Sequence, residues 1–256
     1  MRHRSKALAL VLALFALGAV PAIATTSGTG VWISPPIVQH AATVGSIGSV
    51  TVGNGSGQAM KVTVVARPWL QSKTGLAAPN QRLADTIVRP SASAFTLNTG
   101  TTKAVSLALL HAPTGGSLYA SLDVTAVPLH PKKLPNHVIL EYRLVGSLRL
   151  DPPHPTYGAR VGSVVVSGNH SRGTVTLAVT NTGNTIAATA GSATVQGARG
   201  GANGTISSIR VLPGATVDVP VLSLDGSLPA GSYTLATSLT VAGHRVPVAR
   251  KSFTLH

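Results

Sequence analysis

The chain has 256 residues, with 20 lysines and arginines against six acidic residues and no cysteine. Aromatic residues make up 4% of the sequence and the cations are scattered, which argues against a nucleic-acid-binding protein. Without cysteine the fold contains no disulfide and depends on packing alone. Six acidic residues leave few positions for a catalytic triad or a carboxylate pair, so we expect a protein that is not an enzyme.

The first 24 residues have the pattern of a secretory signal peptide. Arg2, Arg4 and Lys6 precede the apolar run ALALVLALFALGAV, and AIA at residues 22–24 is a small-x-small cleavage site. The run has fourteen residues, fewer than the roughly 20 that a membrane-spanning helix needs. We therefore expect an exported protein, in the periplasm or at the cell surface, with no stable membrane span after residues 1–24 are removed.

The positive charge persists after cleavage, because seventeen cations then face six acids and the net charge is near +11. Such a field attracts polyanions, which makes an anionic cell-wall polymer one candidate partner. An acidic habitat is the alternative explanation, because a surface with few carboxylates loses little charge as the pH falls.

Past the signal peptide the sequence has the pattern of β-strands. Runs rich in Val, Thr, Ile and Leu are separated by Gly, Asn, Pro and Ser. Examples are MKVTVVA (60–66), KAVSLALL (103–110), GTVTLAVT (173–180) and SYTLATSLTV (232–241). No convincing helical period occurs outside the signal peptide, so the fold class is all-β.

The chain also repeats itself. GSVTVGNGSGQAMKVTV (48–64) parallels GTVTLAVTNTGNTIAATAGSATV (173–195), and FTLNTGTTKAVSLAL (95–109) parallels IRVLPGATVDVPVLSL (209–224). The phrases come in the same order in both halves, which indicates two copies of one β-sandwich design.

A tyrosine, Tyr119 or Tyr233, follows a Pro-x-Gly turn in each half. This position is typical of immunoglobulin-like sandwiches, in which the tyrosine hydroxyl bonds back to the preceding corner of the backbone. We predict two tandem immunoglobulin-like domains, residues 28–150 and 158–256, joined by a Pro-rich hinge at residues 151–157.

Two motifs that could carry chemistry have simpler interpretations. GNGSGQ (53–58) is glycine-rich like a phosphate-binding loop, but no Lys-Ser/Thr pair or helix follows it, so we interpret it as a hairpin turn. His130, His137 and His154 match no zinc-binding spacing, and we interpret them as solvated loop residues. We therefore predict no catalytic residues, no metal and no cofactor.

Four phrases carry a resemblance to a known family: VWISPPIVQH (31–40), SVTVGNGSGQAMKVTVVARPWLQ (49–71), VRPSASAFTLNTGTTKAVSLALL (88–110) and LYASLDVTAVPLHPKKLPNHVILEYRLVG (118–146). The first half of the chain resembles the N-terminal domain of the periplasmic pilus (fimbrial) chaperones over about residues 31–150. The two-domain plan continues this likeness.

The resemblance implies a binding function. In that family, the last strand of the first domain is donated to an incomplete pilus subunit and presents alternating apolar side chains to it. Here the row that would bind the partner strand is Val138, Leu140, Tyr142 and Leu144, while Ile139, Glu141, Arg143 and Val145 face the other way. The alternative is that this is an ordinary core-facing row in the last strand of a domain.

The resemblance also implies a carboxylate anchor. The family holds the terminal carboxylate of its subunit between a basic residue on this strand and an arginine on the first strand. Arg143 matches the former by position, and no cation in ISPPIVQ matches the latter. The leading hypothesis is an exported chaperone-like protein that binds a secreted or pilin-like subunit by strand addition. The alternative is a secreted cell-surface or cell-wall-binding adhesion module that uses the basic surface.

Overall fold

A computed structural model describes residues 30–131 and 139–256. The predicted signal peptide, His137 and Val138 lie outside the described residues. Eighteen strands and no helix occur in the described ranges, so nothing there is a helix of the length and apolar character that crosses a membrane.

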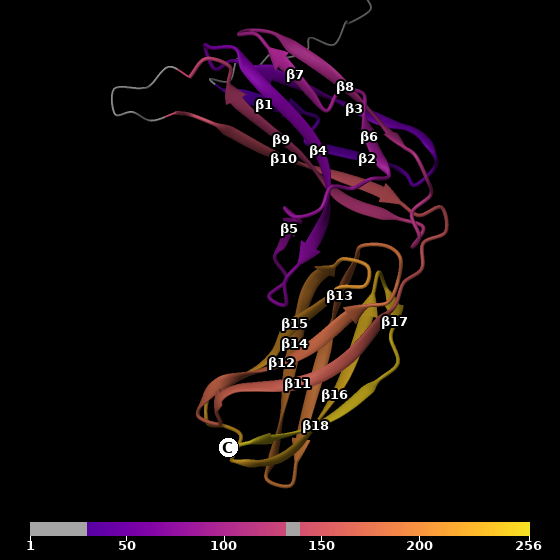
Figure 1. Cartoon of the computed structure of the whole chain (residues 1–256). Coiled ribbons are helices and arrows are strands. Elements are labelled where there is room, and N and C mark those ends of the chain that lie inside the picture. The colour runs from indigo at the N-terminus through magenta and orange to yellow at the C-terminus, as the bar shows by residue number, and fades with distance from the viewer. Residues whose placement is uncertain (1–29, 132–138) are drawn as a thin grey trace, which may run out of the picture.

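Two sheets form the first half of the chain (Figure 1). One has the order β1-β3-β8-β6, with bounds Val31–Ser34, Gly45–Asn54, Thr102–Leu109 and Val88–Pro90. The other has the order β2-β10-β9-β4-β5, with bounds Ile37–Ala41, Tyr142–Asp151, Leu118–Pro128, Met60–Gln71 and Ala77–Pro79, and β7 (Ala94–Leu97) also pairs with β4. The buried side chains between them form one core, which includes Val50, Val62, Leu107, Leu122 and Leu148.

Two further sheets form the second half. One has the order β11-β12-β15, with bounds Ala159–Asn169, Arg172–Asn181 and Thr216–Leu224. The other has the order β14-β13-β16-β17, with bounds Gly200–Val211, Ala187–Gly197, Gly231–Val241 and His244–Arg245, and β18 (Ala249–Leu255) also pairs with β16. A separate core lies between these sheets and includes Val175, Leu177, Val195, Leu235 and Leu255.

The two halves repeat the same strand pairings, in agreement with the phrases that recur in the sequence. The pairs β3–β8, β4–β9 and β4–β7 of the first half correspond to β12–β15, β13–β16 and β13–β14 of the second. The turns that precede β8 and β15 contain Gly100 and Gly214, whose φ angles of 73° and 75° favour glycine. The predicted fold class, all-β with two immunoglobulin-like sandwiches, is therefore confirmed.

The prediction of a hairpin turn at residues 53–58 was wrong. This turn joins β3 to β4, and these strands lie in different sheets. Asn54 organises the turn instead, since its side-chain oxygen accepts hydrogen bonds from the amide and the hydroxyl of Ser56 at 3.0 and 2.6 Å. A local Gly-Asn pattern marks a reversal of the chain, but it does not specify whether the two strands pair with each other.

One buried asparagine holds the same place in each half. Asn54 donates from Nδ2 to the carbonyl of Leu97 at 2.9 Å, and Asn181 donates in the same way to the carbonyl of Val211 at 2.7 Å. Both asparagines are nearly inaccessible, at 2% and 5% exposure. Each therefore ties the end of one strand to the strand that precedes the glycine turn, and satisfies a carbonyl that water does not reach.

We expect Asn54→Ala and Asn181→Ala each to destabilise the protein by about 1 to 3 kcal/mol, because each leaves buried carbonyls without a donor. Denaturant unfolding, followed by the transition midpoint, measures the loss. Asn203→Ala is the matched control, because Asn203 is exposed on β14 and should change stability by less than about 0.5 kcal/mol. Equal midpoints for all three variants would contradict the role of the buried pair.

Candidate partner-binding site

The last strand of the first half, β10, has a neighbour along only part of its outer edge. On one side β9 pairs with it from Tyr142 to Leu150. On the other side β2 runs parallel to it and pairs only with Ser147–Asp151. In the described part of the chain, no strand therefore pairs with residues 142–146 on the side away from β9; we call this segment the open margin.

The open margin exists because the start of the chain divides between two sheets. Residues 31–34 form β1, which pairs with β3, and residues 37–41 form β2, which pairs with β10. Pro35 and Pro36 separate the two strands and have no amide hydrogens to continue either ladder. As a result, β2 reaches only the half of β10 that lies near the second domain.

The backbone of the open margin points its free groups outward. The amide of Ser147 donates to the carbonyl of Pro36 at 2.8 Å, and the carbonyl of Asp151 accepts from Ala42 at 2.8 Å, so alternate residues of β10 face the β2 side. By the same alternation, Arg143 and Val145 direct their N–H and C=O groups to this side. These are the groups that a further strand would pair with.

The structure places the four residues of the predicted partner-binding row differently from one another. Val138 lies outside the described residues, and Leu140 precedes β10 and is 48% exposed. Tyr142 and Leu144 are half-buried and pack against the first core. Strand β10 therefore begins at Tyr142, and the two residues of the row that lie on this strand contact the core of their own domain.

The predicted carboxylate anchor, Arg143, makes an ion pair within its own domain. Its Nη2 lies 2.8 Å from Oδ2 of Asp123, on the neighbouring strand β9. Nε of Arg67 lies 3.0 Å from the same oxygen, and the Asp123 side chain is only 5% exposed. Two guanidinium groups against one carboxylate leave a net positive charge, and the Arg143 side chain remains 47% exposed.

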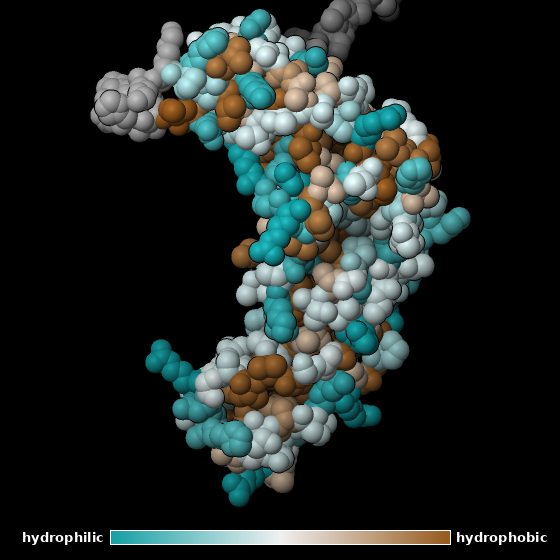
Figure 2. All heavy atoms as spheres, viewed as in Figure 1, coloured by the Kyte–Doolittle hydropathy of each residue, from teal (hydrophilic) through white to brown (hydrophobic). Residues whose placement is uncertain are grey.

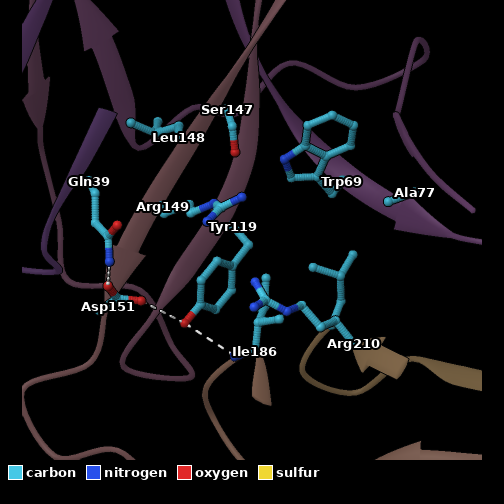
Figure 3. Close-up of a pocket in the computed structure, with 11 residues that line it drawn as sticks. Gln39, Trp69, Ala77, Tyr119, Ser147, Leu148, Arg149, Asp151, Ile186 and Arg210 are labelled. Carbon is cyan, nitrogen blue, oxygen red and sulfur yellow. Dashed lines mark hydrogen bonds between the residues drawn. The ribbon is translucent and has the colours of Figure 1, made fainter. Parts of the chain in front are cut away.

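A pocket of about 380 Å³ lies farther along the same face, between the two domains (Figure 3). The strand register aligns four of its side chains across the sheet, because Gln39 pairs with Arg149 and Arg149 with Tyr119, and Trp69 lies next along β4. The second domain contributes its lining residues Ile186, Arg210 and Leu212. This row and these three side chains enclose what we call the interdomain pocket.

The one acidic residue that lines the interdomain pocket is already hydrogen-bonded. Asp151 accepts from Nε2 of Gln39 at 2.6 Å and from the hydroxyl of Tyr119 at 3.0 Å (Figure 3). Burial raises the pKa of Tyr119, as does the nearby Asp151 carboxylate to a smaller extent, so the hydroxyl keeps its proton at neutral pH. Among the described residues, neither Arg149 nor Arg210 has a carboxylate within 4.0 Å.

The pocket therefore presents two arginines that have no charge partner within the described ranges, and neither was predicted from the sequence. Arg149 could have been found from the sequence. It lies six residues after Arg143, so on one strand both side chains lie on the same face of the sheet, and it comes two residues before the predicted hinge. Nothing in the sequence around Arg210 marks it, because its role depends on how the second domain meets the first.

The prediction that the tyrosine hydroxyl bonds back to the preceding corner was wrong for Tyr119 and is confirmed for Tyr233. Tyr233 donates its hydroxyl proton to the carbonyl of Pro229 at 2.7 Å, in the expected tyrosine corner. The hydroxyl of Tyr119 instead contacts Asp151 and, across the domain boundary, lies 3.0 Å from the hydroxyl of Thr185. Tyr119 therefore joins the two domains.

A second contact between the domains comes from the β4–β5 hairpin. Gln71 donates from Nε2 to the carbonyl of Arg210 at 2.9 Å and accepts from the amide of Leu212 at 2.8 Å. The amide of Asp218 donates to the carbonyl of Lys73 at 2.7 Å. The hairpin thus bridges the concave side of the molecule and holds the backbone of Arg210 beside the pocket (Figure 1).

Comparison with solved structures identifies this architecture. The match to a chain from a chaperone–tip adhesin complex in CFA/I fimbriae biogenesis covers 87% of this chain and 98% of that chain, with 12% sequence identity and a TM-score of 0.52. The match to a chain from the CsuC–CsuE chaperone–tip adhesion subunit complex of Acinetobacter baumannii covers 86% of this chain and 97% of that chain, with 14% sequence identity and a TM-score of 0.47. The match to a chain from the SafA pilin–SafB chaperone complex of Salmonella enterica covers 88% of this chain and 96% of that chain, with 16% sequence identity and a TM-score of 0.46.

No family model matches the sequence, and no curated protein sequence matches it. The likeness to the solved structures shows that the chain has the two-domain immunoglobulin-like fold of the pilus chaperones. The resemblance predicted from the sequence is confirmed at the level of fold.

We expect the double variant Tyr119→Phe, Gln71→Ala to widen the distribution of interdomain distances, because two of the side-chain hydrogen-bond links between the domains are lost. Small-angle scattering, or the distance between two labels on the domains, measures this change. Tyr233→Phe is the matched control, since its hydroxyl bonds within the second domain. If the double variant and the control give the same distribution, these side chains do not set the angle between the domains.

Proposed function

We propose that this protein is an exported, non-catalytic, chaperone-like protein that binds a secreted or pilin-like subunit by β-strand addition at the open margin of β10. One observation supports the proposal above the others: Arg143 and Val145 have outward backbone groups with no partner in the described part of the chain. The solved complex of the same fold that contains a tip adhesin supports a partner of this class.

The size of the open margin indicates that the backbone contributes only part of the affinity. Two residues offer four hydrogen-bonding groups, and each bond contributes about 0.5 to 1.5 kcal/mol net, or roughly 2 to 6 kcal/mol in all. A micromolar complex needs about 8 kcal/mol. We propose that the rest comes from the apolar row, Val138, Leu140, Tyr142 and Leu144, and from a charged contact to the end of the guest strand.

Two arginines of β10 lie along the direction of a guest strand. Arg143 belongs to the open margin itself and its side chain is 47% exposed, although it already forms an ion pair with Asp123. Arg149 lies at the interdomain pocket and has no acidic partner in the described residues. A guest strand that runs parallel to β10, as β2 does, would end toward Arg149. We propose Arg149 as the contact for its terminal carboxylate and Arg143 as a flanking contact, which replaces the anchor predicted from sequence.

Val145→Pro tests strand addition directly. The substitution removes the outward amide of Val145, with which no strand pairs in the described part of the chain, so the domain should remain folded. A guest strand would lose one hydrogen bond and meet the proline ring. We expect the variant to lose at least about tenfold in affinity for a synthetic peptide of alternating Val and Ser with a free carboxylate, measured by calorimetry.

Leu144→Pro is the matched control, because the amide of Leu144 points toward β9 and its removal should lower stability. Full binding by a folded Val145→Pro variant would refute strand addition at this edge. Raising the salt concentration separates the alternative function. Binding to an anionic wall polymer should weaken steeply, whereas strand addition, in which only the contact at the end of the guest strand is charged, should weaken far less.

A further inference from the structure

A second pocket, of about 250 Å³, lies in the second domain beside the predicted hinge. The side chains in its lining that carry polar groups are Tyr157, Thr182, His244 and Arg245. It shares no residue with the interdomain pocket, and in Figure 1 strand β17 lies on the side of the molecule away from the β4–β5 hairpin. We call it the hinge pocket.

A tight turn holds two of these side chains in place. Strand β17 consists of His244 and Arg245 alone, and His244 pairs with Val241, so a two-residue turn joins β16 to β17. Both turn residues, Ala242 and Gly243, have positive φ angles, of 48° and 84°. Such a turn favours Asn-Gly, and an alanine in it is strained. The chain therefore accepts local strain to place His244 and Arg245 at the pocket.

The ring of His244 stacks on the ring of Tyr157, with centroids 4.9 Å apart and planes 15° from parallel. One role for this stack would be to tie the end of the hinge to the second domain. Asn184 already does so, because its Oδ1 accepts from the amide of Thr156 at 2.7 Å and its Nδ2 donates to the carbonyl of His154 at 3.1 Å. The stack is therefore available as a wall of the pocket.

The hydroxyl of Thr182 is held beside this wall by a close backbone approach. The amide of Thr182 donates to the carbonyl of Gly158 at 3.0 Å. A Cβ atom on Gly158 would lie 2.6 Å from Oγ1 of Thr182, so a larger residue would displace the hydroxyl. The glycine thus keeps a hydrogen-bonding group in the lining.

The charge of the hinge pocket is positive and is not neutralised from within. No acidic residue lines it, and across residues 30–131 and 139–256 Arg245 has no carboxylate within 4.0 Å. An exposed guanidinium of this kind, in a chain with a large positive net charge, attracts an anion.

The arrangement of donors favours phosphate among the common anions. A guanidinium binds a carboxylate or a phosphate through paired N–H donors, but a phosphate group has at least one more acceptor oxygen, out of the plane of the first two. The hydroxyl of Thr182 and the imidazole of His244 lie on other walls of the same pocket and can reach such an oxygen. Pockets for drug-sized ligands measure about 300–1,000 Å³, so this one suits a phosphate group and a small part of its carrier.

We propose that the hinge pocket binds a phosphate group, with Arg245 as the main contact and Thr182 and His244 as further donors. Free phosphate and a phosphate ester of a small polyol share this chemistry. The inference goes beyond the function proposed above and does not depend on it, because no residue of β10 lines the hinge pocket. The protein can therefore hold a guest strand and a phosphate group at the same time.

The experiment titrates the ¹⁵N-labelled mature chain with four probes at constant ionic strength: inorganic phosphate, glycerol 3-phosphate, glycerol and acetate. We expect both phosphates to bind saturably, with dissociation constants of about 1 mM, and to shift the amide resonances of residues 182 and 243–246. Glycerol and acetate should bind at least about tenfold more weakly. Tighter binding of glycerol 3-phosphate than of inorganic phosphate would identify an ester as the ligand, and equal binding would identify the free ion.

Arg245→Gln should weaken both phosphates at least about tenfold, since it removes the charged contact. Arg245→Lys should retain part of the affinity, because it keeps the charge and loses the paired donors. Arg172→Gln is the matched control, because Arg172 is also an exposed arginine of the second domain but begins β12 and does not line the pocket. It should leave both affinities unchanged.

Three results would overturn the inference. Equal losses in Arg245→Gln and Arg172→Gln would show that phosphate associates with the basic surface as a whole. Acetate that binds at the same amides as tightly as phosphate would contradict the choice of anion, and a lack of saturable binding by either phosphate would remove the site. None of these results bears on strand addition, which Val145→Pro tests separately.

Discussion

The division of the N-terminal segment between two sheets is the constraint from which the site follows. A strand that stayed in one sheet could cover the full outer edge of β10. Here Pro35 and Pro36 end one ladder and begin another, so β2 covers only Ser147–Asp151. The open margin is thus a consequence of how the first sandwich closes, and among residues 30–131 and 139–256 no strand pairs with the outward backbone groups of Arg143 and Val145.

An open edge is a risk to a folded protein, because it can pair with any extended chain. The short length of the open margin limits that risk, and Arg143 places a charged side chain on it. The concave side of the molecule, where the β4–β5 hairpin and Tyr119 link the domains, carries many hydrophilic side chains in the view of Figure 2. A guest strand would therefore run from a restricted edge toward a positively charged pocket, which favours a partner with a free carboxylate.

Much of the fold could be predicted because its determinants are local. Alternating Val and Thr residues, glycine turns and the recurring phrases were sufficient for an all-β fold with two sandwiches. Local patterns failed where tertiary contacts decide the outcome. Tyr119 and Tyr233 each follow a Pro-x-Gly turn in the sequence. Tyr119, however, begins its strand beside the second domain, whereas Tyr233 lies at the end of β16 that pairs with Gly197, away from that boundary.

The candidate site was accessible to sequence reasoning only in part. The alternation around Arg143 is visible in the sequence, yet its ion pair with Asp123 depends on the register between β9 and β10. The pocket arginines depend on that register and also on the packing of two domains. Neither property follows from the spacing of residues within one segment.

Hydrogen exchange at two adjacent amides, followed by NMR, tests the central claim most directly. The amide of Leu144 points toward β9 and should be protected in the free protein, whereas that of Val145 should exchange rapidly. Addition of the free-acid strand peptide should slow exchange at Val145 and leave Leu144 unchanged. Protection of Val145 in the free protein, or continued rapid exchange there with the peptide bound, would contradict an open margin that accepts a guest strand.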